Sequence, residues 1–285
     1  MPATTANLGP GFDCLGAALG LYLELVFEAA PSSETVAADP AFVAGPVGED
    51  LTHRAFVGAW AAVGEQAPPV KVTVARAYPA GRGLGASASA IVGGLVGARA
   101  LGGLALSDDE LAGLAVRIEG HADNVLPALF GGLVLAGSGV GWQRFTPSPA
   151  VCPIVLVARE AFATKAARQV LPDAVPRADA LANMAACAAL VAILAGLQSP
   201  TGLLRATEDR LHEPYRLPLM TETRALHAGL RAAGVPAALS GAGPSVLILV
   251  DDVAAGEARE VARDLLPDGW GIADAGWDLT GARAH

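Results

Sequence analysis

The sequence predicts an α+β fold built as two layers, in which strands are paired with helices on one side. Short runs of alternating apolar residues, typical of strands, recur between longer runs with apolar residues three and four apart, typical of helices. A proline-rich stretch at 146–153 (TPSPAVCP) divides the chain into two halves. With 285 residues and 53% hydrophobic content, the chain can form two moderate domains, which we expect at 1–148 and 149–285.

The first half is expected to mix strands and helices, with a loop from residue 43 that enters the first helix. Alternating or β-branched apolar residues predict strands at 22–28, 71–76 and 132–136. Apolar spacing, together with a capping box at 107–110, predicts helices at about 55–62, 87–101 and 107–119, and a short one after 121–124.

The second half repeats this mixture after the proline-rich stretch. Apolar runs predict strands at 154–158, 237–240, 246–250 and 272–277. Helical spacing predicts helices at 161–170, 179–197, 202–211, 218–233 and 254–265.

Charge and cysteine usage restrict the function classes. The formal net charge of −9 argues against nucleic acid and anionic membrane as partners, because both bind basic surfaces. Cys14, Cys152 and Cys187 are scattered and odd in number, which indicates reduced thiols in a cytoplasmic protein. The uncharged stretch 180–204 is long enough to span a membrane, but it is rich in Ala and contains Asn183, so we expect a buried helix.

The most informative segment is 79–89 (PAGRGLGASAS), between the strand at 71–76 and the helix at 87–101. Its three glycines allow tight bends and close approach to a ligand, because they have no Cβ. The free N–H groups at the start of the next helix then form an anion site, most often for phosphate. An ordinary glycine-rich loop is the alternative. The candidate ATP-binding residues are Pro79, Ala80, Gly81, Arg82, Gly83, Leu84, Gly85, Ala86, Ser87, Ala88 and Ser89.

This loop differs from two common nucleotide motifs. No Gly-Lys-Ser/Thr follows the glycines, which excludes a Walker A box, and the early βαβ unit of a dinucleotide fingerprint is missing. The chain has only two lysines, Lys71 and Lys165, and neither lies in the loop. A nucleotide bound here would be neutralised by main-chain dipoles, a metal ion and Arg82.

Three segments together resemble the GHMP small-molecule kinases: 2–16 (PATTANLGPGFDCLG), 79–89 and 240–245 (SGAGPS). Three stretches are similar to the homoserine kinases in particular: 6–13 (ANLGPGFD), 119–125 (EGHADNV) and 212–216 (HEPYR). The resemblance implies a two-domain GHMP kinase fold. Its N-terminal half would be like domain 2 of ribosomal protein S5 and its C-terminal half ferredoxin-like, with the active site between them.

The resemblance also implies transfer of the γ-phosphoryl group of ATP to the side-chain hydroxyl of L-homoserine, with Mg²⁺, in threonine biosynthesis. Partners would then be small molecules, with no nucleic acid or membrane, and a homodimer is a further expectation. Two alternatives stay open. One is a GHMP kinase for another small alcohol, such as mevalonate or shikimate. The other is a GHMP-fold protein that binds a ligand without catalysis.

An amino acid needs partners for both of its charges. Asp13 suits the ammonium group, and a guanidinium such as that of Arg168 or Arg216 suits the α-carboxylate. Turn chemistry is the alternative for Asn7 and Asp13, and a solvated helix charge is the alternative for Arg168. The resemblance implies that the substrate is bound by Asn7, Asp13, His121, Thr164, Arg168 and Arg216.

The same resemblance implies the remaining roles. Ser87 and Glu119 would hold Mg²⁺, which uses few protein oxygens and bridges the β- and γ-phosphates. Asn124 and Arg168 would be catalytic. Asn124 stands where relatives such as mevalonate kinase have an Asp base, so we expect transfer without a dedicated base. The third glycine motif would contribute Gly241, Gly243 and Ser245.

Overall fold

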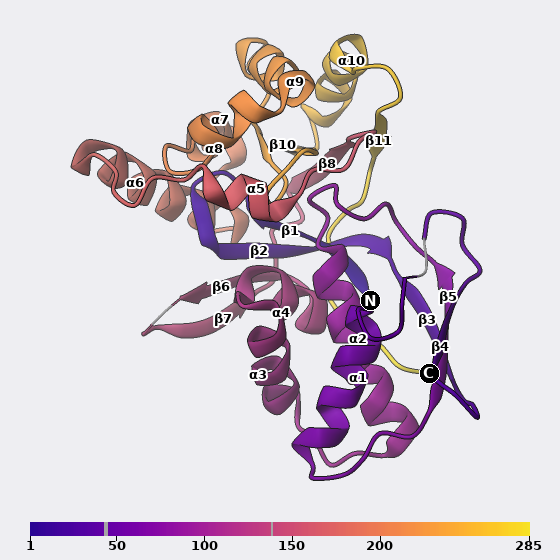
Figure 1. Ribbon diagram of the computed structural model, residues 1–285. Helices are drawn as coiled ribbons and strands as arrows, with labels where there is room; N and C mark the ends of the chain where they lie inside the picture. Colours follow the sequence, from indigo (N-terminus) through magenta and orange to yellow (C-terminus); the bar gives the residue numbers. More distant parts are fainter. Residues whose placement is uncertain (43–44, 138) are drawn as a thin grey trace.

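The computed structural model describes residues 1–42, 45–137 and 139–285, so the beginning of the loop expected from residue 43 lies outside the described residues. The described chain forms three sheets with helices packed around them (Figure 1). Two sheets belong to the N-terminal half and one to the C-terminal half. The α+β class predicted from the sequence is confirmed.

The central sheet of the N-terminal half is antiparallel. Its strand order is β1 (Pro2–Asn7), β2 (Gly11–Tyr22), β6 (Leu133–Gly137) and β7 (Gly141–Phe145). Helix α4 (Ala122–Phe130) packs closely on it, since a Cβ at Gly16 would lie 1.6 Å from the carbonyl oxygen of Asp123. Glycine at this position therefore brings the first turn of α4 against β1 and β2.

A second, three-stranded sheet completes the N-terminal half. Its order is β3 (Glu24–Ala29), β5 (Val70–Arg76) and β4 (Glu34–Ala37), with β4 parallel to β5. The helices that share its core are α1 (Leu51–Ala62), α2 (Ala86–Gly102) and α3 (Asp108–Glu119). Phe56, Ile91 and Leu111, one from each helix, are buried together. The capping box predicted at Ser107 is confirmed at the start of α3.

The C-terminal half is built on an antiparallel sheet. Its strand order is β11 (Gly271–Ala273), β8 (Val151–Val157), β10 (Val246–Asp251) and β9 (Ala237–Leu239). Two amphipathic helices, α9 (Thr221–Ala232) and α10 (Ala255–Leu265), bury Leu226, Leu230 and Ala258 against it. The other helices are α5 (Thr164–Gln169), α6 (Arg177–Leu194), α7 (Leu203–Ala206) and α8 (Glu213–Arg216), with 3₁₀ turns at Pro200–Gly202 and Leu217–Leu219.

The two halves share a third core. Leu15 of β2 and Leu133 of β6 pack with Val155 of β8, Leu247 of β10 and Leu190 of α6. Burial of this shared apolar surface fixes the central sheet against the C-terminal half. The ends of β1 and β9 consequently lie close together, and this is where the site forms.

Several expected elements differ from the structure. The strands β1, β2, β4 and β7 were not expected. β1 (PATTAN) carries small and polar side chains that give little strand signal, although all six residues are buried. The helices expected at 161–170 and 202–211 are shorter. The second ends at Ala206, and Asp209 accepts hydrogen bonds from the main-chain N–H groups of Leu211, His212 and Glu213 before α8 begins.

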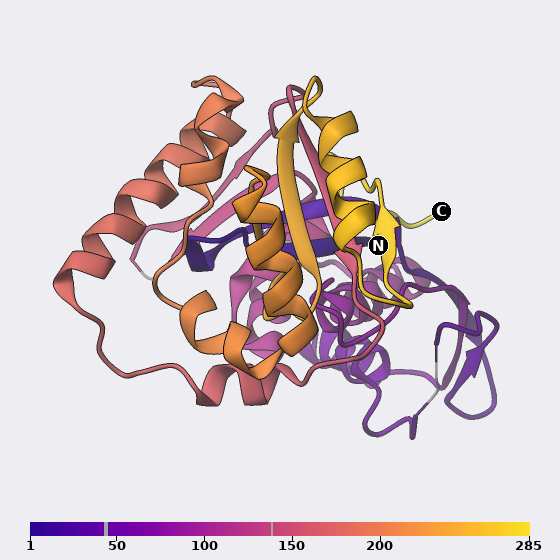
Figure 2. The same cartoon turned by 90° about the horizontal axis from the view of Figure 1, so that it is seen from above.

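The expectation of a buried helix within 180–204 is wrong. Figure 2 shows α6, in salmon, along the outer side of the molecule. Only Asn183, Leu190, Ile193 and Leu194 are buried, although the length and composition of α6 would allow it to span a membrane. Alanine explains this: it raises mean hydropathy, but each methyl group exposes little apolar area to water.

Candidate active site

Three glycine-containing segments, far apart in the sequence, meet between the two halves. The N–H of Gly241, after β9, donates to the carbonyl oxygen of Ala6 in β1 (3.0 Å). The Ser240 hydroxyl donates to the carbonyl oxygen of Gly83 (2.7 Å). A Cβ at Gly83 would lie 2.1 Å from the main-chain carbonyl oxygen of Ser240. All three predicted motifs therefore border one site.

The loop before α2 depends on its glycines. Gly81, Gly83 and Gly85 have φ values of 72°, 75° and 65°, which L residues rarely adopt. A Cβ at Gly85 would lie 1.8 Å from Thr4 Oγ1 and 3.0 Å from Asn124 Oδ1. Gly85 is the N-cap of α2 and supplies no capping side chain, so the first N–H groups of α2 are available to an anion.

The other loop residues have mixed roles. Arg82 donates to the carbonyl oxygens of Ala80 and Arg159, which fastens the loop to the C-terminal half. Ser89 is buried and donates to the carbonyl oxygen of Pro2 (2.7 Å), so its hydroxyl serves β1 in this structure. Pro79, Leu84, Ala86 and Ala88 have apolar side chains, so their polar contacts to a ligand would come from main-chain groups only. ATP contacts along this loop stay a prediction.

The two predicted metal ligands lie in contact. The Ser87 hydroxyl in the first turn of α2 donates to Glu119 Oε1 at the end of α3 (2.6 Å). The described residues contain no group of three or more His, Cys, Asp or Glu side chains placed to hold a metal ion. Mg²⁺ does not need such a cluster, because one or two hard oxygens, waters and phosphate oxygens complete its shell. The donors present fit Mg²⁺ beside a phosphate.

Two predicted substrate residues, one from each half of the chain, bind one another. Both terminal nitrogens of Arg168, on α5, donate to the Asp13 carboxylate of β2 (2.8 and 3.0 Å). Each side chain is 37% exposed, so the pair is open to a ligand. The Asp13 carboxylate raises the pKa of Arg168. Thr164 begins the same short helix, and its side chain lies outside the described part of the structure.

Arg216, at the end of α8, is a second guanidinium of this site and is only 1% exposed. Its Nε donates to the carbonyl oxygen of Ala167 (3.1 Å). Burial, then the positive charge of Arg168, lowers its pKa, while Asp13 acts in the opposite direction. A buried guanidinium close to another cation favours an anionic ligand at this position.

The segment that begins α4 brings three polar side chains to the site. Asn124 Oδ1 accepts a hydrogen bond from the Thr4 hydroxyl (2.8 Å), and its amide Nδ2 lies 3.4 Å from Asp123. His121 Nδ1 lies 3.2 Å from the buried carboxylate of Asp123. This carboxylate raises the pKa of His121. Thr4 and Asp123 were not predicted from the sequence, although Asp123 stands inside the 119–125 motif.

Asn7 is used by the fold itself. Its amide nitrogen donates to the carbonyl oxygen of Gly241 (2.7 Å), and its Oδ1 accepts from the N–H of Asp13 (3.0 Å). The side chain therefore holds the first motif to the third and sets the position of Asp13. Of the third motif, Gly243 has a φ of 83°, and the Ser245 hydroxyl accepts from the N–H of Ala158 (3.1 Å).

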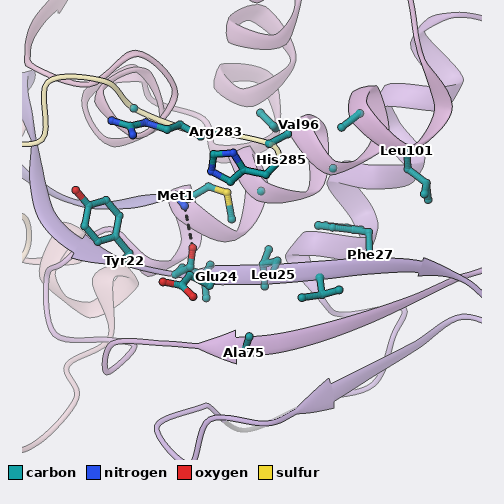
Figure 3. Close-up of a pocket in the computed structure, with 17 residues that line it drawn as sticks. Met1, Tyr22, Glu24, Leu25, Phe27, Ala75, Val96, Leu101, Arg283 and His285 are labelled. Carbon is teal, nitrogen blue, oxygen red and sulfur yellow. Dashed lines mark hydrogen bonds between the residues drawn. The ribbon is translucent and has the colours of Figure 1, made fainter.

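The larger of two described cavities lies elsewhere. About 790 Å³ in volume, it lies between β3 and α2, where Leu25 and Phe27 line it opposite Val96 and Leu101 (Figure 3). It contains none of the predicted site residues. A cavity of about 200 Å³ beside α8 is lined by Glu213 and Arg231 among others. The candidate active site is defined by the meeting of the motifs and not by cavity size.

Comparisons with known proteins agree with this geometry. The family described as "GHMP kinases N terminal domain" matches residues 54–132, and "GHMP kinases C terminal" matches residues 184–268. The chain is 42% identical to a homoserine kinase of Streptomyces avermitilis, over 99% of this chain and 93% of that protein. It is also 42% identical to a homoserine kinase of Clavibacter michiganensis, over 88% of this chain and 82% of that protein.

Solved structures give the same result. The homoserine kinase of Cytophaga hutchinsonii aligns with a TM-score of 0.85 and 25% identity, over 98% of this chain and 94% of that chain. A putative homoserine kinase of Listeria monocytogenes aligns with a TM-score of 0.75 and 28% identity, over 98% and 96% of the two chains. A mevalonate kinase of L. major, at 18% identity and a TM-score of 0.69, shares the fold. The chain belongs to the homoserine kinase family of the GHMP kinases.

Proposed function

We propose that this protein transfers the γ-phosphoryl group of ATP to the side-chain hydroxyl of L-homoserine and thereby supplies O-phospho-L-homoserine for threonine biosynthesis. One observation carries the proposal. Ser240 of the third motif bonds to Gly83 of the glycine loop. Asn7, at the end of β1, bonds to Gly241 of the same third motif and to the main chain of Asp13. The glycine loop is thereby joined to a group of three charges, Asp13, Arg168 and Arg216. An anion site next to a site for a zwitterion suits a kinase with an amino acid as acceptor.

The acceptor site favours an amino acid over a simple acid. Mevalonate and shikimate carry a carboxylate and hydroxyl groups but no ammonium group, and for them Asp13 would be an unfavourable like charge. L-homoserine can exchange the Asp13–Arg168 ion pair for its own two charges. Its ammonium then approaches Asp13, while its carboxylate approaches Arg168 and Arg216. New ion pairs to the ammonium and to the carboxylate then replace the single pair between Asp13 and Arg168, and they offset the desolvation of the charges of the substrate.

The phosphoryl transfer requires alignment more than a base. Asn124 is held by Thr4, and its amide can direct the acceptor hydroxyl but cannot take its proton at neutral pH. The hydroxyl keeps its proton until late and passes it to the phosphoryl oxygens, which a loose transition state permits. Mg²⁺, held by Ser87 and Glu119, would neutralise charge on the β- and γ-phosphates.

Turnover on a panel of acceptors tests the proposal. ADP release would be measured with L-homoserine, L-serine, L-threonine and mevalonate, each with and without Mg²⁺. We expect Mg²⁺-dependent turnover with L-homoserine, and kcat/KM values at least tenfold lower with the others. Faster turnover of mevalonate would contradict the proposal, and nucleotide binding without turnover of any acceptor would favour a ligand-binding protein.

The proposal extends to assembly and location. The outer face of α6 carries exposed Leu181 and Met184 and several alanines, and a second copy of the chain is the partner we propose for it. Sedimentation should give a dimer, and Met184→Glu should give a monomer. The free thiols of Cys14, Cys152 and Cys187 support a cytoplasmic location, where thiols stay reduced.

A further inference from the structure

We propose that His212, as its neutral Nε2–H tautomer, is a positioning residue that orients Arg216 toward the carboxylate of the amino-acid substrate. The inference rests on the proposed function, because it gives Arg216 the carboxylate contact. The sequence alone indicated no role for this histidine. In the structure it is completely buried and bonded to two parts of the site.

The two ring nitrogens of His212 have partners of opposite kind. Nε2 lies 2.9 Å from the carbonyl oxygen of Gly9, and Nδ1 lies 3.2 Å from Nη1 of Arg216. A carbonyl oxygen can only accept a hydrogen bond, and a guanidinium can only donate one. The proton therefore sits on Nε2, and the lone pair of Nδ1 accepts from Arg216. A second proton on Nδ1 would face the N–H of a cation.

The surroundings keep the imidazole in this orientation. The Phe12 ring stacks on His212 with ring centroids 5.3 Å apart, and the Arg216 guanidinium lies 5.1 Å from the Phe12 centroid. Asp209 Oδ2 lies 3.7 Å from Nε2 and accepts the N–H groups of His212 and Glu213. The Asp209 carboxylate thus binds the main-chain N–H groups at the start of α8.

These contacts connect the predicted substrate loop to Arg216. Gly9 belongs to the turn between β1 and β2, and Asp13 lies shortly after it. Within the described residues, Arg216 Nε donates to the carbonyl oxygen of Ala167 and Nη1 donates to His212, while Nη2 forms no hydrogen bond. With two of its three nitrogens fixed, the guanidinium plane cannot rotate, and Nη2 keeps one direction for a ligand.

Three variants separate the functions of the two nitrogens. In His212→Asn the amide falls near the position of Nδ1 and can still accept from Arg216. In His212→Gln the amide falls near Nε2 and can still donate to Gly9. His212→Phe keeps the stacking on Phe12 and loses both hydrogen bonds. His227→Asn is the matched control, because His227 of α9 is also buried and lies 3.3 Å from Glu213 of α8, the helix that carries Arg216.

Calorimetry would measure the binding of L-homoserine and of 3-amino-1-propanol, which has the same hydroxyl and amine but no carboxylate. We expect His212→Phe and His212→Gln to weaken L-homoserine binding by about tenfold to a hundredfold, the effect of a hydrogen bond to a charged group. Binding of 3-amino-1-propanol and the KM for ATP should change less than about threefold. His212→Asn should restore most of the L-homoserine affinity, and His227→Asn should lower Tm alone.

Equal losses for both ligands in His212→Phe would overturn the inference, since the histidine would then act on the loop as a whole. Rescue by Gln and not by Asn would overturn it as well. If His212→Phe does not fold, the Asn and Gln variants decide the question. The proposed function is tested separately by wild-type turnover, because its failure would appear without any substitution.

Discussion

The two sides of the site, for which we propose nucleotide binding and acceptor binding, are built in different ways. The nucleotide side is made mainly of main-chain groups in one continuous segment, 79–89, shaped by three glycines with positive φ. The acceptor side is made of side chains from β2, α4, α5 and α8, and several of these bind one another. A main-chain site is thus recognisable in a local sequence, whereas a side-chain site depends on the whole fold.

Gly85→Ala should have the largest effect, because it acts on the main-chain side. The new Cβ would lie 1.8 Å from Thr4 Oγ1 in a backbone region that costs alanine about 1–2 kcal/mol before any clash. We expect kcat/KM for ATP to fall at least about a hundredfold. Gly103→Ala is the matched control, since Gly103 caps the other end of α2 at φ 60° with open space around it. Equal losses in both variants would contradict the account.

Arg168→Ala tests the side-chain side. It removes one partner of the substrate carboxylate and leaves Asp13 without its guanidinium. We expect KM for L-homoserine to rise about tenfold to a hundredfold, with KM for ATP within about threefold. Arg210→Ala, which breaks the exposed pair with Asp179 at 3.2 Å, should leave both KM values unchanged. A larger rise in KM for ATP than in KM for L-homoserine would place Arg168 on the nucleotide side.

Asn124→Ala tests the point where the two sides meet. Loss of the amide that directs the acceptor hydroxyl should lower kcat about tenfold, equivalent to about 1.4 kcal/mol. Thr4→Val, which removes the hydrogen bond to Asn124, should lower kcat by a smaller factor in the same direction. Steady-state kinetics at saturating ATP and L-homoserine would measure both. An unchanged kcat in Asn124→Ala would exclude this residue from the transfer step.

The smallest expected effect is on stability. Asp123 raises the pKa of His121. This contribution to folding is complete below the ordinary histidine pKa of about 6.5 and is lost as the pH rises through the raised value. The difference in unfolding free energy between wild type and Asp123→Asn should therefore shrink above about pH 6.5. Urea unfolding at several pH values would measure it. A pH dependence that persists in His121→Asn would assign it to another group.

The same contrast explains how much the sequence could predict. The glycine loop, the capping box at Ser107 and the α+β class are local signals, and the structure contains all three. β1 was missed because its small and polar residues have little strand propensity of their own, and it forms by pairing with β2. Contacts such as Asp13–Arg168 join residues 155 positions apart, and no local pattern indicates them.

The resemblance to family motifs identified more residues of the acceptor side than local sequence patterns could. It selected Asp13, Arg168 and Arg216 together, but it did not indicate that two of them form an ion pair. It also included the HEPYR stretch without a reason for its histidine. The hydrogen bonds of His212 became visible only once the turn at Gly9 and the helix α8 were placed together.

A structure with a non-hydrolysable ATP analogue, Mg²⁺ and L-homoserine would test the central claim most directly. We expect the triphosphate on the main-chain N–H groups at the start of α2. The amino acid should lie between Asp13, Arg168 and Arg216, with its hydroxyl beside Asn124 and facing the γ-phosphate. A triphosphate bound elsewhere, or an amino acid bound away from Arg216, would contradict the account.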